Sequence, residues 1–359
     1  MARVTLATIA ATLGISRTTV SNAYNKPEEL SPQLRKKILD TAKELGYPGP
    51  HPAARSLRTQ RTGSIGVLFT DYLTYAFEDI ASRDFLAGIA EASYGSSNGL
   101  TLIPAGPEDF GDDILLNNYP VDGYIVYSVA ADDPYLLSAK NLQVPVVICD
   151  QPAGMADLPF VGIDDFHAIQ PAAQALVEAG HRKIGILSIR LDRKPNNGVV
   201  EQQRLQNARL HVQRSRVLGA LEVFAAHGID QAEVPIIERH INDATTAYDA
   251  AREMLESFPD RTAILCTTDS QALGVLAYAA EAGIRVPEDL SVTGFDGIAP
   301  ALDCGLTTVI QPNKRKGAAA AHLLQGLIDA SLAERASTPE KVYLPTNYFK
   351  GLTVAPPKE

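Results

Sequence analysis

Three aspartates in the sequence follow apolar runs, at places where buried strands would end. Asp150 follows Val-Val-Ile-Cys, Asp269 follows Leu-Cys-Thr-Thr, and Asp296 follows Val-Thr-Gly-Phe. The carboxyl ends of parallel strands form one edge of a sheet, where ligands bind in open α/β folds. Carboxylates at this edge can accept hydrogen bonds from ligand hydroxyl groups. Asp269 has a second interpretation, because an aspartate in this place can instead cap the following helix.

Catalytic and metal-binding signals are missing from the sequence. It contains no GxGxxG, GxxxxGK, GxSxG or HExxH motif, and its seven histidines are scattered. His181 lies in a helix-to-strand turn and is interpreted as structural. The three cysteines, Cys149, Cys266 and Cys304, are far apart and indicate neither a disulfide framework nor a zinc site. We therefore predict binding rather than catalysis, with no catalytic residue, metal or cofactor.

The first 45 residues have the pattern of three short helices. Thr5, Ser16 and Ser31 are candidate N-caps, and Gly14 ends the first helix. The predicted inward faces consist of Leu6, Ile9, Ala10, Leu13, Ile15, Val20, Ala23, Leu34, Ile38, Ala42 and Leu45. The second helix directs Arg17, Thr18, Ser21 and Asn22 outward, as the recognition helix of a helix-turn-helix does.

The charge distribution separates this segment from the rest of the chain. Residues 1–62 hold ten basic and four acidic side chains, a net charge of +6. The whole chain carries −10, so the remainder carries −16. A basic head on an acidic body indicates that only the head meets phosphate groups. A solvated basic face is the alternative interpretation of the charge run alone.

Residues 48–62 form a proline- and arginine-rich linker without an apolar face. It is either a flexible linker or a segment that folds only on DNA. From Ser64 onward, apolar strand patterns alternate with helical patterns, which predicts parallel sheets covered by helices. The predicted strands are Ile65–Phe69, Leu100–Ala105, Tyr124–Tyr127, Val144–Cys149, Ile184–Leu187, Val234–Ile237, Ala263–Cys266, Leu290–Thr293 and Val342–Leu344. Nine strands are many for one sheet, so we expect two doubly wound units.

An ordered series of motifs extends over nearly the whole chain. Val4–Asn25 is followed by Leu45-Gly-Tyr47, Ala54-Arg-Ser-Leu57, Thr62–Val67, Ala179–Gly185, Arg216–Gly219, Asp269–Gly274, Gly294-Phe-Asp296 and Leu306–Pro312. In this order they resemble the lactose/galactose repressor (LacI/GalR) family. The resemblance implies an N-terminal all-α helix-turn-helix and a two-lobed α/β sensor like that of periplasmic binding proteins. The implied division is 1–47 helix-turn-helix, 48–62 hinge, 63–162 and 313–333 first lobe, and 163–312 and 334–359 second lobe.

The resemblance also assigns the DNA contacts. Arg17, Thr18 and Asn22 take the base-reading positions, and asparagine suits adenine where many members carry arginine. Thr5, Ser16, Thr19 and Ser21 are expected to be caps or phosphate partners. The hinge would enter the minor groove with Ala54 and Arg55 against its walls and Leu57 as an apolar wedge. The proline-rich stretch 48–52, with His51 where asparagine is frequent, departs from the family pattern.

In the sensor, the resemblance makes Asp150, Arg216, Thr268 and Asp296 effector contacts, with Asp269 as a further candidate. Tyr75, Phe77 or Phe85 would cover one face of a ring. These residue types suit a neutral polyhydroxy effector, such as a sugar or a nucleoside. Residues 188–215 are longer and more polar than the usual family connection, and we interpret them as a lid or a disordered loop.

These interpretations combine into one predicted function. The chain is expected to be a cytoplasmic, homodimeric transcription regulator, a repressor, that binds a roughly palindromic operator under the control of an effector. No run approaches 18 apolar residues and no signal sequence is recognised, so neither membrane nor secretion is expected. An enzyme with a DNA-binding head and a transport-type binding protein are the alternatives.

Overall fold

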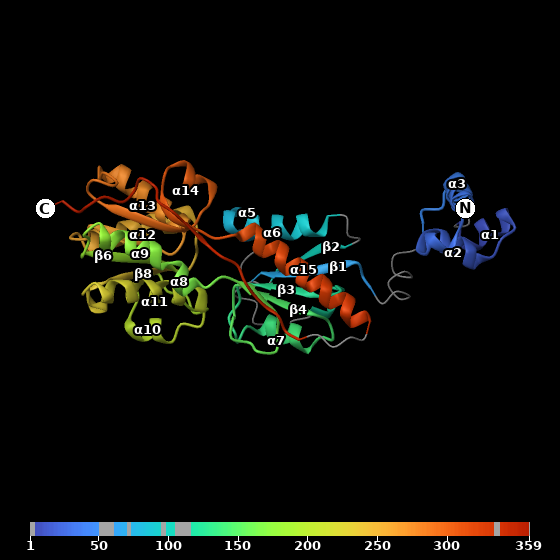
Figure 1. The fold of residues 1–359 in the computed structure, drawn as a ribbon, viewed down its shortest axis with the longest axis horizontal. Coiled ribbons are helices and arrows are strands. Elements are labelled where there is room, and N and C mark those ends of the chain that lie inside the picture. Colours follow the sequence, from blue (N-terminus) through green and yellow to red (C-terminus); the bar gives the residue numbers. More distant parts are fainter. Residues whose placement is uncertain are drawn as a thin grey trace. The chain divides into compact units, whose positions relative to one another are not determined.

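The computed structural model describes residues 4–49, 61–69, 73–94, 98–104, 116–333 and 338–358 (Figure 1). The chain forms two compact units with the boundary between residues 63 and 64. In the described part of the chain, no helix is both long enough and apolar enough to span a membrane.

The first unit consists of three α-helices and a short 3-10 turn. Their bounds are α1 (Leu6–Leu13), α2 (Arg17–Asn25), η1 (Pro27–Glu29) and α3 (Pro32–Glu44). Each α-helix begins at the predicted cap: Thr5, Ser16 and Ser31 accept hydrogen bonds from the amides of Thr8, Thr19 and Leu34 at 3.3, 3.0 and 3.3 Å. Gly14 ends α1 at φ +65°, a conformation that costs glycine little.

The core of this unit contains the residues that the helical periodicity predicts. The fully buried members are Ile9, Ala10, Val20, Ala23, Ile38 and Ala42. The larger Leu6, Leu13, Leu34 and Leu45 pack around them and are half-buried. The three helices therefore share one small core, which holds the outward face of α2 on a defined surface.

The second unit contains two sheets, which define two lobes. The first lobe is built on a parallel sheet in the order β12-β5-β4-β3-β1-β2. Its strands are β1 (Ser64–Phe69), β2 (Gly99–Pro104), β3 (Tyr124–Tyr127), β4 (Val146–Cys149), β5 (Phe160–Gly162) and β12 (Lys341–Tyr343). Its helices are α5 (Tyr75–Glu78), α6 (Ile80–Ser93), η2 (Leu116–Asn118), α7 (Pro134–Asn141) and α15 (Asn313–Leu332).

The second lobe is built on a seven-stranded sheet in the order β13-β11-β10-β9-β6-β8-β7, parallel except for its two edge strands β13 and β7. Its strands are β6 (Ile184–Ile189), β7 (Gly198–Val199), β8 (Ile236–Arg239), β9 (Ala263–Cys266), β10 (Ser291–Asp296), β11 (Thr307–Ile310) and β13 (Asn347–Phe349). Its helices are α8 (Asp165–Ala168), α9 (Gln170–Glu178), α10 (Gln202–Gln206), α11 (His211–Ala226), η3 (Gln231–Glu233), α12 (Ala244–Ser257), α13 (Asp269–Ala282) and α14 (Ala299–Asp303). Two separate sheets confirm the predicted two-lobed α/β fold.

Three features differ from the sequence-based expectations. The strands β5, β7, β11 and β13 were not predicted, since they are short or lie in polar sequence. β12 pairs with β5 in the first lobe, so the last crossover follows Tyr343 rather than preceding residue 334. Residues 188–215 do not form a disordered loop, because they contain the end of β6, then β7, α10 and the start of α11.

Helices α6 and α15 pack together unusually closely in the first lobe (Figure 1). A Cβ atom on Gly88 would lie 1.9 Å from the carbonyl oxygen of Lys314, and one on Gly317 would lie 2.0 Å from that of Phe85. Glycine at these two positions permits backbone contact between the helices. This packing fixes Lys316 in a fully buried place beside the ends of the strands.

Candidate functional site

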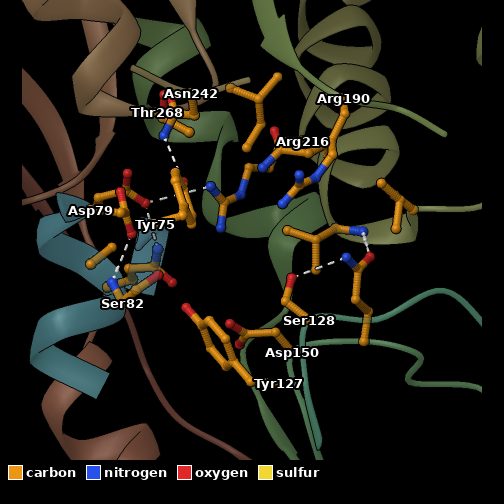
Figure 2. A pocket seen from close by; sticks show the side chains of 18 of the residues that line it. Tyr75, Asp79, Ser82, Tyr127, Ser128, Asp150, Arg190, Arg216, Asn242 and Thr268 are labelled. Carbon is orange, nitrogen blue, oxygen red and sulfur yellow. Dashed lines mark hydrogen bonds and ion pairs between the residues drawn. The ribbon is translucent and has the colours of Figure 1, made fainter. Parts of the chain in front are cut away.

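A cavity that is partly open to solvent lies between the two lobes at the carboxyl ends of their strands (Figure 2). We call it the interlobe cleft, and this position matches the rule for ligand sites in open α/β folds. It is lined by Phe69, Tyr75, Asp79, Ala81, Ser82, Tyr127, Ser128, Asp150, Gln151, Ile189, Arg190, Leu210, Val212, Gln213, Arg216, Asn242, Thr268, Asp296 and Gln311. Of the predicted effector residues, the structure brings together Tyr75, Asp150, Arg216, Thr268 and Asp296 in this lining.

Arg216, on α11, is the central cation of the cleft. Its Nε donates to Asp165 Oδ1 at 2.8 Å, and its Nη1 donates to the carbonyl oxygen of Thr267 at 2.9 Å. Nη1 also lies 3.6 Å from Asp296 Oδ1, and the guanidinium group lies over the Phe295 ring at 3.8 Å. Burial raises the pKa of the Asp296 carboxyl, although the charge of Arg216 opposes this shift. Arg216 is thus held rigidly between two buried carboxyl groups.

A second cation, Lys316, supports the opposite side of the cleft. Its Nζ donates to both oxygens of Asp150 at 2.8 and 2.9 Å and to Gln311 Oε1 at 2.8 Å. The Gln311 amide in turn donates to Asp296 Oδ1 at 2.5 Å. Asp150, Lys316, Gln311 and Asp296 therefore form a continuous chain of hydrogen bonds that joins the first lobe to the second.

Asp150 and Asp296 also share an uncommon backbone conformation. Their φ angles are +67° and +131°, in a region that residues with a side chain rarely adopt. Such conformations have a local energetic cost and concentrate at binding sites, where the surrounding structure holds them. In both residues the conformation sets the direction of the carboxylate at the end of a strand.

Asp269 does not line the interlobe cleft. Its carboxylate is fully buried and accepts hydrogen bonds from the amides of Gly297 and Ile298 at 2.7 and 2.9 Å and from the Thr308 hydroxyl at 2.5 Å. The cap of α13 is Thr268, which accepts from the Gln271 amide at 3.3 Å. Asp269 therefore stabilises the turn after β10, which differs from both interpretations of the sequence.

The predicted aromatic residues take three different positions. Tyr75 lines the cleft, and its hydroxyl accepts from the Asn242 amide group at 3.1 Å. Phe77 is 55% exposed and does not line the cleft. Phe85 is fully buried and stacks on Tyr127 at a centroid distance of 4.1 Å. Phe85 thus supports a ring of the cleft wall, and Tyr127 is the residue that contacts the cavity.

Several lining residues were not predicted from the sequence. Gln213 is the most informative, because its Oε1 is buried and no described residue donates a hydrogen bond to it. Asn242 could have been suspected from the polar sequence that follows β8, and Gln311 from the crossover motif. Nothing in the sequence signals Asp79, which caps α6 by accepting from the Ser82 amide at 2.7 Å and whose pKa is raised by burial.

Of the predicted DNA-binding residues, Ser16, Arg17, Thr18, Thr19, Ser21 and Asn22 lie on α2 or at its N-cap, and Thr5 caps α1. Arg17 and Thr18 are exposed, and Thr5 and Ser16 are caps whose partners are described above. Ser16 also bonds the hydroxyl of Thr19 at 2.8 Å, and the Asn25 amide donates to Ser21 Oγ at 3.2 Å. Asn22 donates to Glu29 Oε2 at 2.7 Å, so its amide must exchange this partner to contact a base. Ala54, Arg55 and Leu57 lie outside the described residues.

The fold and the cleft define a two-lobed α/β sensor, which this chain carries together with a helix-turn-helix head. Residues 173–354 match the family model of the periplasmic binding protein-like domain. The chain is 55% identical over 356 residues to the HTH-type transcriptional regulator IpsA of Corynebacterium glutamicum, with 98% of both chains covered. It is 41% identical over 357 residues to the HTH-type transcriptional regulator Rv3575c of Mycobacterium tuberculosis, covering 99% of this chain and 98% of the relative.

The solved structures agree with these relatives. A LacI family transcriptional regulator from Corynebacterium glutamicum is 50% identical, with a TM-score of 0.76 and 98% of both chains covered. The lac repressor dimer bound to operator and the anti-inducer ONPF shares the fold at 22% identity, with a TM-score of 0.78 and 99% and 100% of the chains covered. The chain belongs to the LacI family of DNA-binding transcriptional regulators, a family of regulators rather than enzymes.

Proposed function

We propose that this regulator is a homodimeric cytoplasmic repressor whose operator binding is controlled by a neutral polyhydroxy effector, a sugar or a nucleoside, in the interlobe cleft. The observation that carries the proposal is the balanced polar lining of the cleft. Three carboxyl groups, on Asp79, Asp150 and Asp296, line it together with the guanidinium groups of Arg190 and Arg216, and Lys316 bonds Asp150. Such a wall offers both donors and acceptors of hydrogen bonds, as the hydroxyl groups of a ligand require.

The aromatic part of the lining supports the same class of ligand. Phe69 and Tyr127 contact at a centroid distance of 5.4 Å, and Tyr75 lines the cleft with them. Aromatic faces suit the C–H face of a sugar ring or a nucleoside base. A related regulator, CelR, was solved in complex with cellobiose and is 25% identical to this chain, with a TM-score of 0.68 and 98% of this chain covered. We infer a ligand of similar chemistry here.

The test of effector binding is a thermal-shift screen of the full chain against sugars, nucleosides and purines. A ligand that binds only the folded protein stabilises it by about 2.7 kcal/mol at 100 times its Kd. We expect a hit among neutral polyhydroxy compounds. A hit only among the free purine bases, which lack the hydroxyl groups of a sugar, would contradict the proposed effector class, and no hit at all would contradict effector control.

Gln213→Met localises any hit to the interlobe cleft. No described residue donates to the buried Gln213 Oε1, so its removal should leave the stability of the free protein equal or higher. In the complex, an effector hydroxyl would donate to this oxygen, and the variant should lose about 0.5–1.5 kcal/mol of effector affinity. Isothermal titration with the screened hit measures the loss. Unchanged affinity would show that the ligand binds elsewhere.

On DNA, we propose that two copies place their α2 helices in successive major grooves of a roughly palindromic operator. Arg17, Thr18 and Asn22 would read bases, while Thr5, Ser16, Thr19 and Ser21 would fix the register on phosphates. Residues 48–62 would enter the minor groove between the two heads, with Ala54 and Arg55 against the groove walls and Leu57 inserted into a base step. Effector-dependent lobe closure would change the spacing of these hinges.

Arg17→Ala tests the base-reading part of this proposal. An arginine paired with guanine typically contributes about 1–3 kcal/mol of discrimination against the wrong base. We expect selection from a randomised duplex library to return sites with relaxed preference at one position of each half-site. Lys37→Ala is the matched control, because it removes one exposed charge from α3 and should weaken binding to all sequences alike. An unchanged site preference in Arg17→Ala would remove it from the base readers.

A further inference from the structure

One segment of the second lobe, residues 190–212, contacts the first lobe along one side of the interlobe cleft. Arg209 Nη1 donates to Asp132 Oδ2 at 2.5 Å, and the Val212 amide donates to Gln151 Oε1 at 3.0 Å. Burial raises the pKa of Asp133, and the charge of Arg193 from the same segment opposes this shift. This segment lies within residues 188–215, the stretch that is longer and more polar than the family connection.

A buried glutamate gives the segment a fixed shape. Glu238, on β8, is fully buried, and its carboxylate accepts four hydrogen bonds from the segment. The donors are the Leu191 amide at 2.8 Å, Asn196 Nδ2 at 3.1 Å, and Arg204 Nε and Nη2 at 2.5 and 2.8 Å. Breaking this network is costly, because the loss of any donor would leave a buried charge poorly compensated. The network therefore keeps the segment rigid.

A contact within the second lobe orients the side chain of Arg209. Its Nε and Nη2 donate to the two oxygens of Asp192 at 2.9 and 2.6 Å, and this pairing lowers the pKa of Asp192 to about 2. The remaining Nη1 points at Asp132 of the first lobe. Exposed ion pairs are commonly weak, partly because two side chains must be ordered to form them. Here the bidentate pair within the second lobe has already ordered the arginine.

We propose that Arg209 and Asp132 form a latch that holds the two lobes together beside the interlobe cleft. The latch joins the segment anchored on Glu238 to the loop between β3 and α7. Its regulatory meaning rests on the proposed function: since both lobes line the cleft, a latch that holds them together raises effector affinity. Arg209 and Asp132 are therefore positioning residues, which tune the response without lining the cleft.

Amide-resolved hydrogen exchange of the full chain, without added ligand, tests the latch. The Val212 amide lies in the first turn of α11, where an amide has no acceptor within its helix, and it bonds across the cleft to Gln151. Its exchange thus reports lobe opening. We expect Arg209→Gln and Asp132→Asn each to raise its exchange rate roughly 1.5- to 5-fold, and the double variant no further. In 1 M salt the difference should disappear, because exposed charges are screened.

Two controls separate the latch from general loosening. Arg285→Gln breaks an exposed ion pair with Asp289, at 2.6 Å, within the second lobe and should leave Val212 unchanged. The Leu191 amide, bonded to Glu238, should remain protected in Arg209→Gln. Unchanged Val212 exchange, or equal acceleration of Leu191, would overturn the proposal. Since no effector is used, failure of the latch is distinguishable from failure of effector binding.

Discussion

Replacing Arg216 with methionine should lower the free energy of unfolding by about 3–5 kcal/mol, the typical cost of removing one partner of a buried ion pair. The arginine is 4% exposed and bonds Asp165 at 2.8 Å, and Asp296 lies 3.6 Å away. Without it, two buried carboxyl groups lose their cation, and the carbonyl of Thr267 loses a donor. Urea unfolding of the full chain, followed by circular dichroism, measures the loss.

Two further variants identify the cause of that loss. Arg252→Met removes an exposed partner of Asp249, at 2.9 Å, and should cost at most about 1 kcal/mol. Asp165→Asn in the Arg216→Met background should recover part of the stability, because it removes one unpaired buried charge. If Arg216→Met lowers the free energy of unfolding by no more than Arg252→Met does, the buried ion pairs of Arg216 do not stabilise the second lobe.

Lys316→Met should have a similar effect in the first lobe, again about 3–5 kcal/mol. The ammonium group is fully buried and bonds both oxygens of Asp150 and Gln311 Oε1. Its removal deprives the buried Asp150 carboxylate of the cation that bonds it and interrupts the chain of hydrogen bonds between the lobes. The same unfolding measurement applies, and effector affinity should fall as well because Asp150 lines the cleft.

The matched control lies on the same helix. Lys314→Met removes an exposed partner of Glu91, at 2.9 Å, and should cost at most about 1 kcal/mol. Asp150→Asn combined with Lys316→Met should be more stable than Lys316→Met alone, since the unpaired charge is then absent. Equal stability of these two variants would mean that Lys316 acts through packing rather than through its charge.

Local signals in the sequence predicted the elements well. Thr5, Ser16 and Ser31 cap the three helices of the first unit, as expected, because capping depends only on neighbouring residues. The strands missed were short, such as the edge strand β7 with two residues, whose formation depends on a partner strand. β12 joins the first sheet for the same reason, since no local pattern specifies which sheet a short strand pairs with.

The cleft was predictable only in part. Polar residues that follow strands indicated Asp150 and Asp296 correctly as neighbours of one cavity, because sheet topology alone brings strand ends together. The same rule also selected Asp269, whose side chain turns into the second lobe to bond Thr308. Lys316 was not predicted, since a lysine within a helix is normally exposed and only the packing of α15 against α6 buries it.

A ligand in the interlobe cleft should change operator affinity, and a direct measurement of DNA binding checks this. Fluorescence anisotropy gives the Kd of the full chain for a selected operator, with and without the compound that raises its Tm most in the screen. We expect this Kd to change by at least about fivefold in the unmodified chain. If a compound stabilises the protein and depends on Gln213 for binding, yet leaves the operator Kd unchanged, effector control of DNA binding is wrong.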